Sequence, residues 1–170
     1  MTGKGSLNHN SRKFHAKNTD PNRTHWNVEY CNEDIKDVYH ELFDDALKRY
    51  NDKQTRKDRK IDDYYEKIRS GKQEKLFHEV ILQIGDKDNM GSETMEGQLA
   101  AKILDEYMKG FQERNPTLRV FAAHLHLDEA TPHLHIDFIP YVTDWKGKGM
   151  DTRVSLKQAL KSLGFQGGNK

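Results

Sequence analysis

The sequence predicts an α+β fold, in which an antiparallel β-sheet carries helices packed on one face. Segments with the two-residue period of strands and segments with a helical period are mixed along the chain. The last two predicted strands are separated by only a short loop, as in a hairpin. The length of 170 residues suits one domain with its own hydrophobic core.

Each predicted element rests on a local pattern. Residues 1–24 show no period and are expected to be irregular. Residues 31–53 carry apolar side chains at spacings of three and four, which predicts a helix with Asn32 as its N-cap. The predicted order is a strand at 25–30, helices at 31–53 and 59–71, a strand at 75–85, a helix at 93–115, strands at 118–127 and 133–142, and a helix at 155–165.

Composition sets limits on the function but does not identify it. Charged residues make up 32% of the chain and the net charge is only +1, so overall charge is a weak indication of nucleic-acid binding. The single cysteine, Cys31, favours a reducing compartment, and no apolar stretch is long enough to span a membrane. We therefore expect a cytoplasmic protein. Residues 1–170 are predicted to form one domain, the N-terminal part of a longer protein.

A histidine-rich hairpin at residues 122–140 is the most informative segment. Strand alternation places His124 and His126 on one face of the first strand, and His133 and His135 on one face of the second. Residues that pair across antiparallel strands share a face, so the faces match if His126 lies opposite His133 and His124 opposite His135. The pattern therefore predicts a cluster of imidazoles on one side of the sheet.

Such a cluster predicts a metal site on the central hairpin. Imidazole nitrogens bind divalent transition metals, and a set of three leaves coordination positions open for water or a phosphate oxygen. The alternative is a surface on which the histidines are neutral polar residues. That reading fits a single histidine better than it fits four histidines with Asp128 and Glu129 between the two pairs.

Three segments carry a resemblance to a known family. HLDEATPHLH (126–135), NHNSR (8–12) and DPNRTHWNVEY (20–30) resemble the motifs of plasmid mobilisation and recombination relaxases of the MobV (Mob/Pre) type, in the HUH endonuclease superfamily. The resemblance covers most of the chain, although better-known members have a further N-terminal strand before the position of His9.

The resemblance implies an HUH relaxase-like fold that nicks and rejoins one DNA strand at the transfer origin of a mobile element. It implies single-stranded or hairpin DNA as partner, other transfer proteins as further candidates, and no membrane contact. Mn²⁺ or Mg²⁺ is the expected cofactor, with Zn²⁺ as an alternative. The implied roles are metal ligation by His126, His133 and His135, nucleophilic attack by His9, acidic catalysis by Glu129, and support from Arg12, with His124 and Asp128 behind the ligands.

The chemistry requires a nucleophile and a means of neutralising the scissile phosphate. A metal is a Lewis acid for the phosphate oxygens, and a covalent 5′-phosphoryl link conserves the energy needed to rejoin the strand. Tyr64 and Lys67 form a YxxK pair, but it precedes the hairpin, and Tyr64 and Tyr65 are expected to pack a helix. Whether Glu129 ligates the metal or orients His9 is open at this stage.

Basic residues are the expected contacts to DNA phosphates. The candidates lie in the N-terminal segment and in a basic run near residue 57: Lys13, Lys17, Arg23, Arg56, Lys57 and Arg59. Trp26 or Trp145 would stack on a base or anchor a loop.

Three rival interpretations accompany the relaxase reading. A rolling-circle replication initiator would use a tyrosine nucleophile. A non-catalytic DNA-binding protein would hold zinc in a closed site that includes His124 as a fourth ligand. A cupin-like metalloenzyme would require many short strands, whereas this chain has several helical segments.

Overall fold

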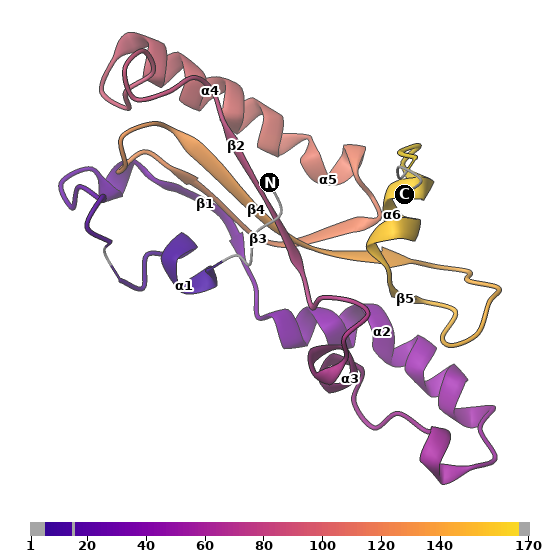
Figure 1. Ribbon diagram of the computed structural model, residues 1–170. Helices are drawn as coiled ribbons and strands as arrows, with labels where there is room; N and C mark the ends of the chain where they lie inside the picture. Colours follow the sequence, from indigo (N-terminus) through magenta and orange to yellow (C-terminus); the bar gives the residue numbers. More distant parts are fainter. Residues whose placement is uncertain (1–5, 15, 167–170) are drawn as a thin grey trace. The chain divides into compact units, whose positions relative to one another are not determined.

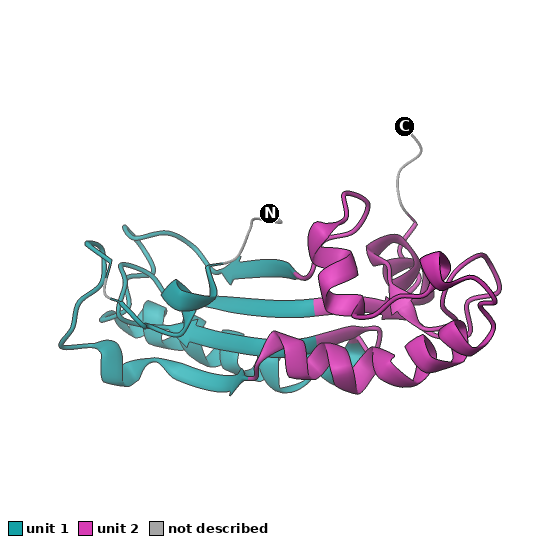
Figure 2. Cartoon of the chain, turned by 90° about the horizontal axis from the view of Figure 1, so that it is seen from below, with its two compact units in different colours: residues 1–32, 78–114, 120–138 teal, residues 33–77, 115–119, 139–170 magenta. Residues whose placement is uncertain are grey.

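The computed structural model describes residues 6–14 and 16–166 of the chain. They divide into two compact units, coloured teal and magenta in Figure 2. Unit 1 contains residues 1–32, 78–114 and 120–138, and unit 2 contains residues 33–77, 115–119 and 139–170. Among the described residues, no helix combines the length and the apolar character needed to cross a bilayer.

Helices and strands are mixed along the chain, as Figure 1 shows. The elements are α1 (Leu7–Asn10), the 3₁₀ turn η1 (Thr24–Trp26), β1 (Val28–Asn32), α2 (Ile35–Asp52), η2 (Lys57–Arg59), α3 (Tyr64–Ser70), β2 (His78–Gln83), α4 (Met95–Lys109), α5 (Phe111–Arg114), β3 (Leu118–His126), β4 (His133–Val142), β5 (Arg153–Val154) and α6 (Leu156–Ser162).

The strands form one sheet in the order β1-β3-β4-β2, and the short β5 pairs with β4. β1 pairs antiparallel with β3, and β2 pairs antiparallel with β4. In the β2–β4 register Glu79 lies opposite Asp137 and Ile81 lies opposite His135, so these residues share one face. The predicted α+β class with an antiparallel sheet is confirmed.

The two faces of the sheet in unit 1 differ in chemistry. Leu125, Leu134 and Ile136 are buried on one face, and the histidines occupy the other by strand alternation. Figure 1 shows α4 running alongside these strands, and Tyr30 of β1 donates a hydrogen bond to Asp105 of α4 at 2.7 Å. The apolar face of the sheet therefore lies toward α4, whereas the histidine face is available to α1 and to a functional site.

Unit 2 has an aromatic core of its own. The ring centroids of Phe43 and Tyr64 lie 4.9 Å apart, and those of Tyr39 and Phe43 lie 5.2 Å apart. The hydroxyl of Tyr64 accepts from the backbone N–H of Val154 at 3.1 Å, which ties α3 to β5. Tyr64 is therefore a packing residue, as expected.

The boundaries differ from the sequence prediction where local contacts override a simple period. Asn32 belongs to β1, and the helix that follows is capped by Asp34, whose carboxylate accepts from the N–H of Lys36. The N-cap assignment to Asn32 was therefore wrong. The helix predicted at 93–115 is interrupted at Gly110, a residue type of low helix propensity.

The segment predicted to be irregular contains α1 and a strained residue. α1 has only four residues, and Ser6 caps it by accepting from the N–H of His9. Arg12 follows with φ of 52°, which a non-glycine residue adopts only where its surroundings hold it there. A periodic pattern could not predict this segment, because contacts with residues distant in the sequence hold it in place.

Candidate active site and metal centre

Three histidines converge on one face of the hairpin. His126 ends β3, and His133 and His135 begin β4; all three are buried. Their potential ligand atoms lie within 4.8 Å of one another. The ring centroid of His126 is 5.2 Å from that of His133 and 4.8 Å from that of His135. The predicted convergence of the three side chains is confirmed.

The hydrogen bonds of the triad leave nitrogens free to bind a metal. Nδ1 of His133 lies 2.9 Å from the carbonyl oxygen of Thr131, and Nδ1 of His135 lies 2.7 Å from a carboxylate oxygen of Glu79. The Nε2 atoms of these two rings are therefore the candidate ligands. Nε2 of His135 and Nδ1 of His126 are buried without a hydrogen-bond partner. Buried orphan nitrogens of this kind fit a bound divalent metal.

Burial also keeps the triad in the protonation state that a metal requires. Burial lowers the pKa of His126 to about 2, against a weaker opposing effect of the carbonyl of Asn10. Burial likewise lowers the pKa of His133. Both rings are therefore neutral near pH 7 and offer a lone pair.

His124 lies beside the triad but outside it. Its ring centroid is 6.2 Å from that of His126, and its Nε2 lies 3.1 Å from a carboxylate oxygen of Glu29 in β1. The group of potential ligands within the described residues does not include it. The side chains therefore do not form a closed site with four histidine ligands.

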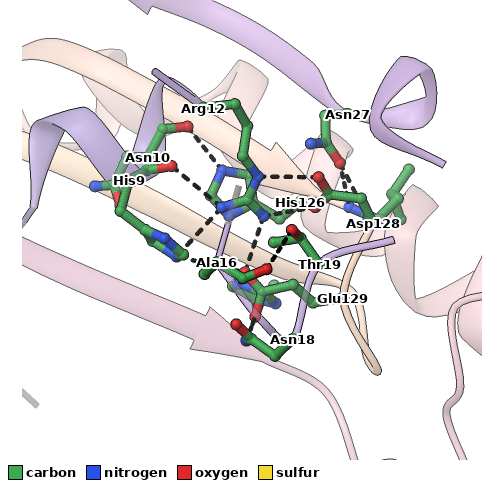
Figure 3. A network of polar contacts seen from close by, with 12 residues as sticks. His9, Asn10, Arg12, Ala16, Asn18, Thr19, Asn27, His126, Asp128 and Glu129 are labelled. Atoms are coloured by element: carbon green, nitrogen blue, oxygen red, sulfur yellow. Dashed lines mark hydrogen bonds and ion pairs between the residues drawn. The ribbon is translucent and has the colours of Figure 1, made fainter. Parts of the chain in front are cut away.

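Arg12 joins the N-terminal segment to the loop of the hairpin (Figure 3). Its guanidinium donates to both carboxylate oxygens of Asp128, at 2.9 and 2.5 Å, and to Glu129 at 2.9 Å. Burial alone would raise the pKa of Asp128, but the hydrogen bonds and the charge of Arg12 hold it at about 2. This bidentate ion pair accounts for the positive φ of Arg12.

The same contacts bring His9 to Glu129, which is 120 residues away in the sequence. Nε2 of His9 lies 3.4 Å from Oε1 of Glu129, and 3.2 Å from Nη1 of Arg12. The other oxygen of Glu129 accepts from the side-chain amide of Asn18 at 2.6 Å. Burial, and then the charge of Arg12, lower the pKa of His9. The imidazole is therefore neutral near pH 7, as a nucleophile must be.

A cleft of about 280 Å³ opens beside these groups. His9, Glu129, His133 and His135 line it, together with Asn18, Ile81, Gln83, Ala130 and Thr131. The cleft thus exposes the candidate nucleophile, the carboxylate and two members of the triad to one space. A phosphate group placed there would meet all of them.

A buried polar network beneath the cleft was missed by the sequence analysis. The side-chain amide of Asn10 donates to Glu79 at 2.9 Å and to Asp137 at 3.0 Å. The carbonyl oxygen of Asn10 lies 2.8 Å from Nε2 of His126. Asn10 stands in the NHNSR motif and Asp137 stands two residues after His135 in β4, but the partner Glu79 lies on another strand and no sequence spacing connects it to them.

The predicted DNA-contacting residues differ in exposure and lie in both units. Lys13 and Lys17 are exposed near α1. The guanidinium of Arg23 binds Asp20 at 3.1 Å and the carbonyl of Leu127 at 3.3 Å, with 15% of its side chain exposed. In unit 2, Arg56, Lys57 and Arg59 are exposed around η2, and Arg56 forms an ion pair with Asp58. Trp145 anchors a loop, since its Nε1 donates to the carbonyl of Lys148.

The fold and the histidine site define a metal-dependent DNA relaxase. A model of the Mob_Pre family, described as plasmid recombination enzyme, matches residues 4–164, and the chain belongs to this family. No curated protein sequence matches the chain significantly.

A solved structure of a related relaxase shares the fold. The chain is 26% identical to the Mn-bound MobM relaxase domain (MOBV; Mob_Pre) in complex with 22 nucleotides of plasmid pMV158 oriT DNA, with a TM-score of 0.50 over 92% of this chain and 72% of that one. A second structure of that domain, with oriT DNA carrying a 3′ thiophosphate, is 25% identical with a TM-score of 0.45 over 90% and 67% of the two chains. The family and the enzyme class predicted from the sequence are confirmed.

Proposed function

We propose that the chain nicks and rejoins one specific strand at the transfer origin of a plasmid or integrative element, through a covalent 5′-phosphoryl intermediate on His9. The observation that carries the proposal is the convergence of His9, Glu129 and two histidines of the triad, His133 and His135, on one cleft. The related MobM domain binds oriT DNA and Mn. A cytoplasmic location follows from this substrate.

In this mechanism the neutral ring of His9 attacks the scissile phosphorus. An N–P bond forms and the bond from phosphorus to the 3′-oxygen breaks, so the leaving strand takes up a proton and ends in a 3′-hydroxyl. Glu129 orients the ring and accepts its N–H proton, and Arg12 holds Glu129 in place. Reversal by a 3′-hydroxyl restores the phosphodiester without an external energy source.

His126, His133 and His135 would hold the divalent metal, with Mn²⁺ as the first candidate and Mg²⁺ or Zn²⁺ as alternatives. When bound there, the metal supplies a Lewis acid for the non-bridging phosphate oxygens. Glu79 and Thr131 fix the ring orientations from behind. Lys13 and Lys17, which are exposed in the segment that carries His9, are candidates to hold the DNA strand by its phosphates.

The replication-initiator alternative needs a tyrosine at the site. Among the described residues that line the cleft there is no tyrosine. The hydroxyl of Tyr64 is engaged by the N–H of Val154, and that of Tyr141 donates to the carbonyl of Pro116. The packing of these tyrosines therefore supports His9 as the nucleophile.

The proposal predicts relaxation of supercoiled plasmid that carries the cognate origin. With Mn²⁺ present, the protein should convert supercoiled into open circles, and a chelator should prevent the conversion. A plasmid without the origin is the matched control. Degradation of both plasmids would mean an unspecific nuclease and would refute the proposed specificity.

Asn10→Ala should reduce metal affinity and nicking by about 10- to 100-fold, the usual effect of losing a group that orients ligands. The substitution leaves Glu79 and Asp137 facing each other across β2 and β4 without the amide that bridges them. Isothermal titration with Mn²⁺ and a nicking assay measure the two effects. Asn8→Ala is the control, since Asn8 is exposed on the same helix. Equal behaviour of the two variants would contradict the bridging role.

Charge reversal of Arg56, Lys57 and Arg59 together should reduce the dependence of DNA affinity on salt. Each lost phosphate contact lowers the slope of log K against log salt by about one, because fewer counterions are released. Lys161→Glu, an exposed change on α6, is the control. An unchanged slope would show that the run around η2 is only a solvated surface.

A further inference from the structure

A second basic site lies in unit 2, where the proposed chemistry assigns no role. A hollow of about 590 Å³ is lined by residues of α3, of the segment before β2 and of the loop before β5. Four of its lining residues are cations: Lys67, Lys72, Lys148 and Arg153. We propose that this hollow binds backbone phosphates of DNA, as a contact separate from the metal site.

The four cations are without a carboxylate partner among the ion pairs of the described residues. Two arginines of the same unit, Arg49 and Arg69, are in contrast paired with Asp151 and Glu66. Like charges gathered around one space repel each other, and a bound anion relieves that repulsion. The hollow therefore has the charge of an anion site.

The lining also contains one carboxylate, that of Glu74. Burial raises the pKa of Glu74, whereas the charge of Arg153, and then the backbone N–H of Leu156 and the hydroxyl of Ser155 at the start of α6, lower it. Glu74 supports that helix and does not lie in an ion pair with the lysines among the described residues. One acidic group against four basic ones leaves the lining strongly positive.

The loop before β5 is built to present its cations. Trp145 is fixed by two hydrogen bonds, from its backbone N–H to the carbonyl of Asp151 and from Nε1 to that of Lys148. The guanidinium of Arg153 lies 5.8 Å from the centre of the Trp145 ring, within reach of a cation–π contact. Gly147 allows the loop to fold over this ring, because a Cβ there would lie 2.6 Å from Nε1. The guanidinium of Arg153 and the backbone of Lys148 are thus held by contacts with Trp145.

Burial lowers the pKa of Lys67, and the charge of Arg153 lowers it further, as expected for two cations that face one space. Several fixed cations suit a polyanion better than a single carboxylate ligand, and phosphates are the anions that lysine and arginine bind in nucleic acids. DNA is the polyanion that the proposed function brings to this chain, and the inference rests on that function. The residues of the hollow all belong to unit 2, and those of the metal site all belong to unit 1.

The test is a double variant, Lys72→Ala with Lys148→Ala, because both lysines are exposed and their loss leaves the core intact. Fluorescence anisotropy with labelled origin DNA should show weaker binding and a salt slope reduced by about two. Lys161→Ala, an exposed lysine of the same unit outside the hollow, should leave the slope unchanged. Lys161→Ala should also nick origin plasmid at the wild-type rate.

Two results would overturn the inference. One is an unchanged slope and affinity in the double variant. The other is binding of inorganic phosphate or a mononucleotide that the variant loses while its DNA affinity is unaffected, which would make the hollow a site for a free anion. Failure of the proposed function would look different. The wild type would bind DNA and the double variant would show the predicted reduction of the salt slope, yet the wild type would not nick the DNA.

Discussion

His9→Ala should lower the nicking rate by at least about 10³-fold, the scale on which removal of a nucleophile acts. DNA affinity and metal content should stay near those of the wild type, because His9 is a partly exposed side chain of α1 and the triad is complete without it. Gel analysis of origin plasmid, anisotropy and metal analysis measure the three quantities. Phe14→Ala is a matched control, since Phe14 is an exposed ring 6.0 Å from His9.

The tyrosine variants complete this test. Tyr64→Phe and Tyr65→Phe should nick at the wild-type rate, because their rings pack within unit 2 and line no part of the cleft. If His9→Ala still nicks and one of the tyrosine variants does not, the nucleophile has been assigned to the wrong residue.

Removing a histidine of the triad has the second large expected effect. His126→Ala should abolish stoichiometric metal binding and reduce nicking by more than the roughly 100-fold that loss of an orienting group produces. The ring of His126 is 1% exposed and is in contact with both other rings of the triad. Metal content of the dialysed protein and the nicking rate are the measurements.

His124→Ala is the control that separates a triad from a cluster of four. His124 stands two residues earlier on the same strand, but its nitrogen is directed to Glu29. The variant should retain about one metal per chain. Loss of the metal in His124→Ala, together with retention in His126→Ala, would contradict the assignment of ligands.

The sequence predicted the hairpin well because one strong pattern determined it. Alternation of histidine with leucine and isoleucine leaves only one face for His126, His133 and His135, and the structure places them there. Long-range partners were not predictable in this way. Glu79 reaches His135 from a different strand, and the contact depends on the register of β2 against β4.

The N-terminal segment also depends on long-range contacts that a sequence pattern does not reveal. Without a hydrophobic period, residues 1–24 read as irregular, yet α1 lies where His9 and Asn10 can reach the hairpin. What holds the segment is the ion pair of Arg12 with Asp128 and Glu129, which joins residues more than 110 positions apart. For His9 and Arg12, only the resemblance of the NHNSR motif to a relaxase family pointed to a role.

The most direct test of the central claim is to find the atom to which the cut strand becomes attached. The protein is incubated with Mn²⁺ and an origin oligonucleotide labelled on the 3′ side of the nick, then denatured, digested and analysed by mass spectrometry. The account predicts a covalent adduct on the peptide that contains His9, labile in acid and stable in alkali, as a phosphoramidate is. An adduct on a tyrosine, which survives acid, or cleavage without any adduct would contradict it.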